Sequence, residues 1–260
     1  MNIHVPSLEP LEPRVRFLGL DYDALSTDKV LDLLIARPPE ASFAAIVTPN
    51  ADHLVRIEHS PVIAAAYRDA GMRLNDSRIV GLLARLRRIP LTTVPGADLV
   101  RDLFDSPRFD TSWPILVVGG SEALFAQLVS QFGLQAARHY DAPMGLLTNP
   151  ASMAATVDHI EAHPARFILL AVGSPQQELI AQAVAERGNA RGIGLCIGAA
   201  VEFLVHPDRR APQWMSRFGL EWLFRLLREP RRLWKRYLVD SPKVFALAWR
   251  DWRTERAAGK

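Results

Sequence analysis

Asp76 is the residue of this sequence best suited to acid–base chemistry. It follows a short apolar stretch in Leu74–Asn75–Asp76–Ser77, where we expect a strand to end and a helix to begin. A carboxylate at the end of a strand can accept the proton of an incoming hydroxyl group as a general base. An Asp in front of a helix is also a common N-cap, so position alone leaves both interpretations open. Thr48 and Asn50, after another apolar stretch, are interpreted first as turn and cap residues.

Two turns containing glycine have residue types that suit phosphates or sugars. In 119–121, Gly-Gly-Ser, backbone N–H groups can approach a phosphate at a helix N-terminus, although a tight turn explains the glycines equally well. In 173–178, Gly-Ser-Pro-Gln-Gln-Glu, adjacent side-chain amides both donate and accept, which suits sugar hydroxyls. Glu202 follows the last predicted strand, where an acid can hold ribose hydroxyls or form an ion pair.

Metal-ligand spacings give little support for a metal site. Asp21–Tyr22–Asp23 has the spacing of a D-x-D metal motif, but it precedes a predicted helix, and Asp at a helix start needs no metal. The histidines are scattered, and no Cys/His cluster has zinc spacing. Walker A and Gly-x-Ser-x-Gly sequences are missing as well. We therefore predict neither a metal nor a cofactor.

Apolar stretches of strand length alternate with helical patterns along the chain. The alternation predicts an α/β fold with a doubly wound, mostly parallel sheet. In such sheets ligands bind beyond the carboxyl ends of the strands, which is where the polar turns described above fall. Strands are predicted at 15–20, 43–48, 72–74, 115–118, 135–139, 167–172 and 194–197, with helices in most intervals between them.

Charge divides the 260 residues into an acidic body and a basic tail. Residues 1–206 carry 17 Lys/Arg and 22 Asp/Glu, a net charge of −5, whereas 207–260 carry 14 and 6, a net charge of +8. Five of the six Trp also lie in the tail. We therefore expect a loose Pro-rich arm at 1–15, a core at 16–206 and a basic, Trp-rich helical appendage at 207–260, which Pro230 and Pro242 divide into successive helices.

The tail is open to several interpretations. A basic amphipathic helix with Trp is typical of an element lying in a membrane interface. Arg225, Arg228 and Arg232 have i, i+3, i+7 spacing, so they can share a face and bind a pyrophosphate, for which Arg suits better than Lys. Nucleic acid is disfavoured because the body is acidic. A packed appendage with a solvated basic face remains the structural alternative.

The lack of a recognisable secretory signal or membrane span in this sequence predicts a chain that stays in the cytoplasm. No apolar run follows a basic stretch at the N-terminus, and no segment has the roughly 18 continuous apolar residues of a membrane span. The single Cys196 cannot form an internal disulfide.

Several motifs together resemble the WecG/TagA/CpsF family of bacterial glycosyltransferases, glycosyltransferase family 26. The resemblance covers roughly residues 15–240 in the family's order. The motifs are 47–52 (VTPNAD), 74–76 (LND), 94–99 (VPGADL), 173–178 (GSPQQE), 210–215 (RAPQWM), 219–225 (GLEWLFR) and 236–238 (RYL).

The resemblance implies a Rossmann-like core and an inverting, metal-independent transferase without cofactor. Such an enzyme moves a sugar from a UDP-sugar to an undecaprenyl-diphosphate-linked saccharide in cell-surface polysaccharide or exopolysaccharide biosynthesis. It would be peripheral on the inner face of the bacterial cell membrane, with a homo-oligomer left open. The donor sugar, of N-acetylmannosamine, N-acetylmannosaminuronic acid or glucose type, is not determined, nor is the acceptor saccharide.

Family site residues can be carried over position by position. The family's catalytic aspartate falls on Asp76, where Ser77 stands in place of the glycine of many members. The sugar-binding threonine and asparagine fall on Thr48 and Asn50, and the active-site glutamine falls on Gln177. The arginines expected at the acceptor diphosphate fall on Arg225, Arg232 and either Lys235 or Arg236. For the UDP-sugar donor we predict the turn residues Gly119, Gly120, Gly173, Pro175, Gly198 and Glu202.

Two functions from other classes are alternatives. A catalytically silent, nucleotide-binding regulatory protein at the membrane would bind UDP without transfer or hydrolysis, and the intact Asp76 and Gln177 argue against it. A doubly wound sheet also permits a dinucleotide-dependent oxidoreductase, but the sequence lacks G-x-G-x-x-G.

Overall fold

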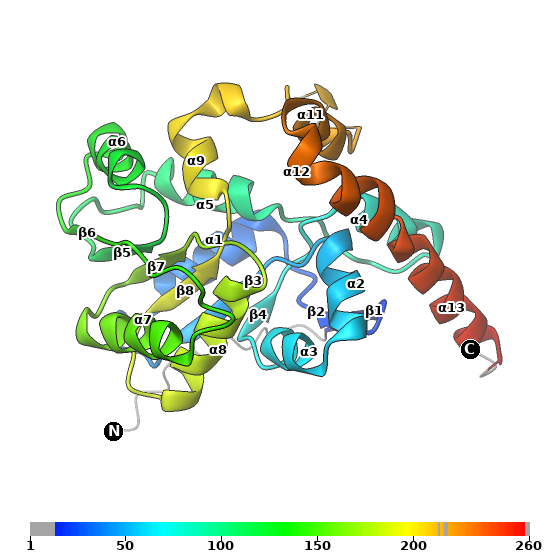
Figure 1. The fold of residues 1–260 in the computed structure, drawn as a ribbon, viewed down its shortest axis with the longest axis horizontal. Helices are drawn as coiled ribbons and strands as arrows, with labels where there is room; N and C mark the ends of the chain where they lie inside the picture. Colours follow the sequence, from blue (N-terminus) through cyan, green and yellow to red (C-terminus); the bar gives the residue numbers. More distant parts are fainter. Residues whose placement is uncertain (1–13, 213, 216–217, 258–260) are drawn as a thin grey trace.

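A six-stranded parallel sheet forms the centre of the protein. The computed structural model describes residues 14–212, 214–215 and 218–257 (Figure 1). The strand order is β4-β3-β8-β7-β5-β6, and every neighbouring pair is parallel. The predicted α/β fold is therefore confirmed. The strands are β3 (Ala44–Val47), β4 (Met72–Arg73), β5 (Ile115–Val118), β6 (Ala137–Tyr140), β7 (Phe167–Leu170) and β8 (Ile193–Cys196).

The central strands of the sheet are apolar because helices cover both faces, whereas the edge strands β4 and β6 include polar residues. β5, β7 and β8 are buried at every position, as expected for parallel strands between two helical layers. One apolar cluster lies on each face. The helices α2, α3, α7 and α8 lie on one side of the sheet in Figure 1, and α1, α5, α6 and α9 lie on the other.

Side-chain caps set the starts of several helices. Ser26, Asn50, Ser60, Ser77 and Ser121 each accept a backbone N–H of the first turn. The helices of the core are α1 (Thr27–Ala36), α2 (Ala51–His59), α3 (Pro61–Arg68), α4 (Arg78–Leu86), α5 (Gly96–Phe104), α6 (Glu122–Phe132), α7 (Pro150–Ala162), α8 (Gln176–Arg187) and α9 (Ala200–Val205).

The first predicted strand is wrong in form, because residues 15–20 do not make one strand of the sheet. β1 (Val15–Phe17) and β2 (Leu20–Tyr22) instead form a separate antiparallel hairpin. The chain reverses at Leu18 and Gly19, whose φ angles of 48° and 80° lie in the left-handed region. The arm predicted at 1–15 lies outside the described residues up to position 13, and Val15 belongs to β1.

Within the D-x-D spacing, Asp21 lies on β2 of this hairpin, and Asp23 follows β2 ahead of α1. Asp21 pairs with Arg16, and buried Asp23 pairs with Arg14. Asp23 also accepts the backbone N–H of Arg73. Both carboxylates therefore have arginine partners in a structural role.

The C-terminal appendage consists of successive helices that cross one end of the sheet and continue along the side of α2 (Figure 1). Breaks in the helices fall at Pro230 and Pro242, as predicted. The appendage contains η1 (Pro207–Arg209), α11 (Glu221–Arg228), α12 (Pro230–Trp234), the π-helical η2 (Lys235–Asp240) and α13 (Lys243–Ala257). Ion pairs with the core hold it, namely Arg210–Asp98, Arg236–Asp52, Arg250–Glu58 and Arg87–Asp251. Within the described residues, no helix is long and apolar enough to cross a membrane.

Candidate active site

A large pocket opens between the carboxyl ends of the strands and the appendage. Its volume is about 1360 Å³. The turns after β3, β4, β7 and β8 form its core side, and α11, α12 and η2 contribute arginines from the opposite side. The core and the tail therefore contribute to one site.

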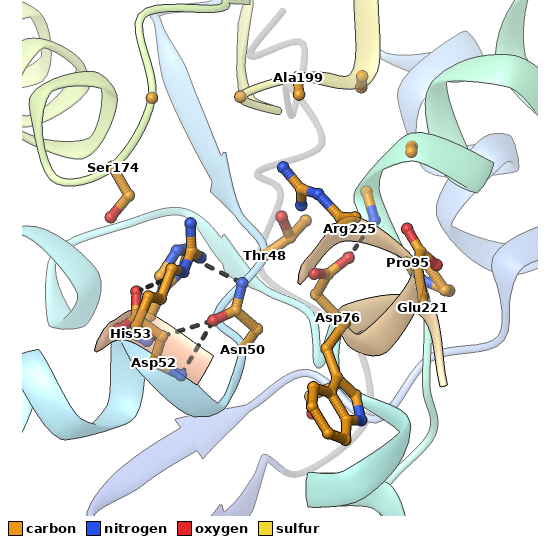
Figure 2. A pocket seen from close by; sticks show the side chains of 18 of the residues that line it. Thr48, Asn50, Asp52, His53, Asp76, Pro95, Ser174, Ala199, Glu221 and Arg225 are labelled. Atoms are coloured by element: carbon orange, nitrogen blue, oxygen red, sulfur yellow. Dashed lines mark hydrogen bonds and ion pairs between the residues drawn. The ribbon is translucent and has the colours of Figure 1, made fainter. Parts of the chain in front are cut away.

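Asp76 lies in this pocket and does not cap the following helix. The N-cap of α4 is Ser77, whose Oγ accepts the N–H of Val80. Asp76 Oδ1 instead accepts the N–H of Gly96 at 2.8 Å, from the first residue of α5. The capping interpretation of Asp76 is thus wrong, and its carboxylate faces the pocket (Figure 2).

The surroundings of Asp76 adjust its proton affinity. Burial raises the pKa of this carboxyl to about 6. The Gly96 N–H lowers the pKa, the Glu221 charge raises it, and the Asn50 amide and the Arg225 charge lower it. Figure 2 shows Glu221 and Arg225, both from α11, beside the carboxylate. A carboxylate with a pKa about one unit below neutral pH is ionised and still basic enough to accept a proton.

Thr48 directly follows β3 and lies near Asp76 (Figure 2). Its hydroxyl donates to the carbonyl of Cys196 at 3.4 Å and lines the pocket. Gly96 packs closely against it, since a Cβ at Gly96 would lie 2.8 Å from Thr48 Oγ1. A glycine is therefore required at position 96 for the Thr48 side chain and the Gly96 N–H to share this corner of the site.

Asn50 has two functions, because its amide oxygen and nitrogen point to different partners. The oxygen caps α2 by accepting the N–H groups of Asp52 and His53, which confirms the predicted cap. The nitrogen lies 3.4 Å from His53 Nε2, and the amide also interacts with the Asp76 carboxylate. Capping thereby fixes which amide atom faces the pocket.

A buried polar chain behind Asn50 extends to the opposite side of the site. The Tyr67 hydroxyl donates to Glu178 Oε1 at 2.9 Å and lies 2.9 Å from His53 Nδ1. Gln177 Nε2 donates to the same Glu178 oxygen, and Gln177 Oε1 accepts the Gly198 N–H. If Tyr67 donates to Glu178, its oxygen accepts from His53 Nδ1–H, which leaves Nε2 free to accept from Asn50.

The titratable members of this chain are shifted toward their neutral forms. Burial, followed by the charges of Arg236 and Arg56, lowers the pKa of His53 well below its usual value. Burial raises the pKa of Tyr67 and of Glu178. The imidazole is therefore neutral at physiological pH and can serve as a fixed acceptor.

Some of the turn residues predicted to bind the donor line the pocket, and others do not. Gly120, Gly173, Gly198 and Glu202 line it, whereas Gly119 and Pro175 do not. The Gly119 N–H donates to the Tyr140 carbonyl, so it is already engaged in a hydrogen bond between the ends of β5 and β6. Glu202 lies on α9, a helix that the sequence analysis did not predict, and it pairs with Arg209.

The basic residues of the appendage meet the pocket selectively. Arg225, Arg228, Arg232 and Arg236 line it, and Lys235 does not. The first three line the same pocket from both sides of the break at Pro230. Arg236 Nε lies 3.1 Å from Asp52 Oδ2, which also pairs with Arg56 at 2.8 Å.

Sequence reasoning missed His53, Tyr67, Glu178 and Arg56 as parts of the site. Of these four, only Glu178 could have been recognised from the sequence. It is a Glu at the start of a predicted helix, with no basic residue nearby in the sequence. Among the residues that the structure describes, no group of three or more His, Cys, Asp and Glu could hold a metal ion.

The arrangement supplies the parts needed to transfer a group to a hydroxyl. It combines a basic carboxylate, amides and a hydroxyl for orienting a polar substrate, and arginines for phosphate charge.

A comparison with protein families gives an independent result. The sequence model described as Glycosyl transferase WecG/TagA/CpsF family matches residues 15–258. This match covers nearly the whole chain, so the protein belongs to the WecG/TagA/CpsF family of glycosyltransferases.

Proposed function

We propose that this glycosyltransferase moves a sugar from a UDP-sugar to a polyprenyl-diphosphate-linked saccharide, with inversion and without a metal. The observation that carries the proposal is the position of Asp76. Its carboxylate, with a pKa of about 6, lies between the Asn50 amide and Arg225 in a pocket that the core and the basic appendage build together. A general base is thereby combined with diphosphate-binding chemistry in one site.

The reaction would be a single displacement at the anomeric carbon. The acceptor hydroxyl oxygen forms a bond to that carbon while the bond to the UDP oxygen breaks. Asp76 accepts the hydroxyl proton, and UDP leaves with the bonding electron pair. Attack from the side opposite the leaving group inverts the configuration. Thr48, Asn50 and Gln177 would orient the sugars through hydrogen bonds.

Two diphosphates need compensation of charge in this scheme. For the departing UDP, the pocket offers backbone at Gly120 and Gly173, while the Gly198 N–H is used by Gln177. For the acceptor diphosphate, Arg225, Arg228 and Arg232 offer guanidinium groups that line the same pocket. Glu202 would accept ribose hydroxyls from its place on α9.

A lipid-linked acceptor requires the protein to approach the cell membrane, on its inner face. The appendage exposes large apolar side chains among its arginines, in the pattern of an interfacial helix. These exposed side chains are Trp214, Phe218, Leu227, Trp234, Leu238, Val239, Phe245 and Trp249.

The proposal is tested by measuring UDP release from a panel of UDP-sugars in the presence of a polyprenyl-diphosphate saccharide. One donor should give UDP together with an elongated, inverted product. Asp76→Asn should lower product formation by about 10²- to 10⁴-fold while UDP still binds. Asp105→Asn, which changes an exposed carboxylate on the core, should behave as the natural protein. UDP binding without transfer or hydrolysis, across the panel, would support the silent regulatory alternative instead.

A further inference from the structure

The outer face of α4 is basic and apolar together, although α4 belongs to the core. Leu82 is 56% exposed and Leu86 is 73% exposed. Arg78 and Arg85 are exposed on the same helical face, at i and i+7. The segment from Arg78 to Arg88 contains four Arg and neither Asp nor Glu. This combination is unusual for a helix face of an acidic body.

Two contacts join α4 to the appendage. The Arg87 guanidinium at its C-terminal end pairs with Asp251 of α13 at 2.6 Å. At its other end, a Cβ on Gly219 would lie 3.7 Å from Arg78 Cβ. Arg78 also lines the pocket. The α4 face therefore begins at the pocket and runs beside the appendage, which exposes Phe218 near one end of α4 and Trp249 near the other.

We propose that the α4 face formed by Arg78, Leu82, Arg85 and Leu86 is a second membrane-contacting surface, which binds an anionic bilayer together with the appendage. The inference rests on the proposed function, because it assumes that the appendage approaches a lipid surface. It assigns to the catalytic core a contact of its own with that surface.

Charge favours a lipid surface as the occupant of this face. Arginines alternate with leucines, so the side chains can bind anionic headgroups while the leucines enter the interface. A second copy of the chain in a two-fold contact would bring arginines against arginines, because such a contact repeats the same patch on both subunits. An acidic protein partner would complement the arginines, but it would not match the leucines that alternate with them.

Contact with the bilayer at two places, the appendage and the α4 face, would fix the orientation of the pocket relative to the membrane. A single appendage could rotate about its own axis on a bilayer. With α4 on the membrane as well, the pocket region near Arg78 would be held toward the lipid, where an acceptor diphosphate lies at headgroup level.

The test uses a reporter placed on α4. The only cysteine, Cys196, is buried, so Leu86→Cys can be labelled selectively with an environment-sensitive fluorophore. Val62→Cys provides the matched control, since Val62 is 63% exposed on α3. Addition of phosphatidylglycerol vesicles should shift the emission of the probe at position 86 to the blue and leave the probe at position 62 unchanged. Phosphatidylcholine vesicles should give a smaller shift.

Sedimentation with the same vesicles supplies a second measurement. Leu82→Gln with Leu86→Gln should weaken binding about tenfold, and Arg85→Gln about fivefold, since each group contributes near the surface. The controls Val62→Gln and Arg68→Gln on α3 should bind as the natural protein. Circular dichroism checks that each variant is folded.

The outcomes separate this inference from the proposed function. If the natural protein sediments with vesicles while the probe at position 86 stays in water, the α4 surface is refuted and the membrane role of the appendage stands. If the natural protein does not bind vesicles, the α4 surface and the membrane role of the appendage both fail, and the transfer reaction is still judged by its own assay of UDP release. A blue shift that depends on protein concentration without vesicles would assign the face to self-association and overturn the proposal.

Discussion

Arg236 of η2 lies 3.1 Å from Asp52 of α2, guanidinium Nε to carboxylate Oδ2. The Asp52 side chain is only 5% exposed, and it comes two residues after Asn50, the cap residue that faces Asp76. The appendage is thus attached to the core at the base of the candidate site. Its docking and the arrangement of the reacting groups therefore depend on one another.

Arg236→Gln should loosen the appendage because Asp52 would lose one of the two arginines with which it pairs among the described residues, and Arg56 would remain. We expect faster amide hydrogen exchange across η2 and α13. A double-mutant cycle with Asp52→Asn should give a coupling free energy of about 1 kcal/mol in urea unfolding. Arg232→Gln is the control, since Arg232 pairs with Glu229 within its own helical segment. Equal exchange in both variants would mean that the ion pair does not hold the appendage.

The pH dependence of transfer should report Asp76. Because the carboxylate form accepts the proton, kcat/KM should rise as the pH increases through about 6 and then level off. Asp76→Asn should lower kcat by about 10²- to 10⁴-fold and remove this acid limb. Steady-state kinetics with continuous detection of UDP between acid and alkaline pH measures both effects. An unchanged acid limb in the variant would assign the base to another group.

The raised pKa of Asp76 also predicts a gain of stability on substitution. The folded protein binds the Asp76 proton more tightly than the unfolded chain, whose Asp has a pKa of 3.8. This stabilising contribution is complete below about pH 4 and is lost as the pH rises through about 6. Asp76→Asn should therefore raise the free energy of unfolding near neutral pH by up to about 3 kcal/mol relative to the natural protein. Urea unfolding below about pH 4 and near neutral pH tests this prediction. A stabilisation that is confined to acid pH would contradict it.

Arg225→Gln should shift the acid limb of the pH profile upward. The Arg225 charge lowers the pKa of Asp76, so its removal leaves the carboxyl with a higher pKa. The loss of a guanidinium from a diphosphate should also lower kcat/KM by about tenfold or more. Arg231→Gln provides a control, because Arg231 is exposed on α12 and does not line the pocket. If both variants behave alike, Arg225 acts only through the net charge of the appendage.

Tyr67→Phe should separate the two halves of the buried polar chain. His53 and Glu178 would each lose a partner at 2.9 Å, which should cost about 1–3 kcal/mol of stability. Asn50 would lose its fixed acceptor, so kcat should fall while KM for the donor changes little. The matched control is Tyr140→Phe, whose ring stacks on His159 away from the pocket. A loss of stability with unchanged kcat would limit the chain to a structural role.

The sequence by itself determined the architecture of the core. Apolar stretches of strand length alternating with helical patterns can bury their residues only in a parallel sheet covered on both faces, which the structure has. Asp76, Thr48 and Asn50 were predicted to meet because the carboxyl ends of parallel strands share one edge. The spacing of Arg225, Arg228 and Arg232 likewise predicted a common face, since helical periodicity is a local property.

Only the tertiary structure decided the contacts between distant segments. Local sequence permits Asp76 or Ser77 as the cap of α4, and the Gly96 N–H from another helix decides between them. Whether Lys235 or Arg236 faces the pocket depends on the phase of η2, which Asp52 fixes from the core. The chain from His53 through Tyr67 to Glu178 joins α2, α3 and α8, whose approach results from burial of apolar surface on the whole sheet.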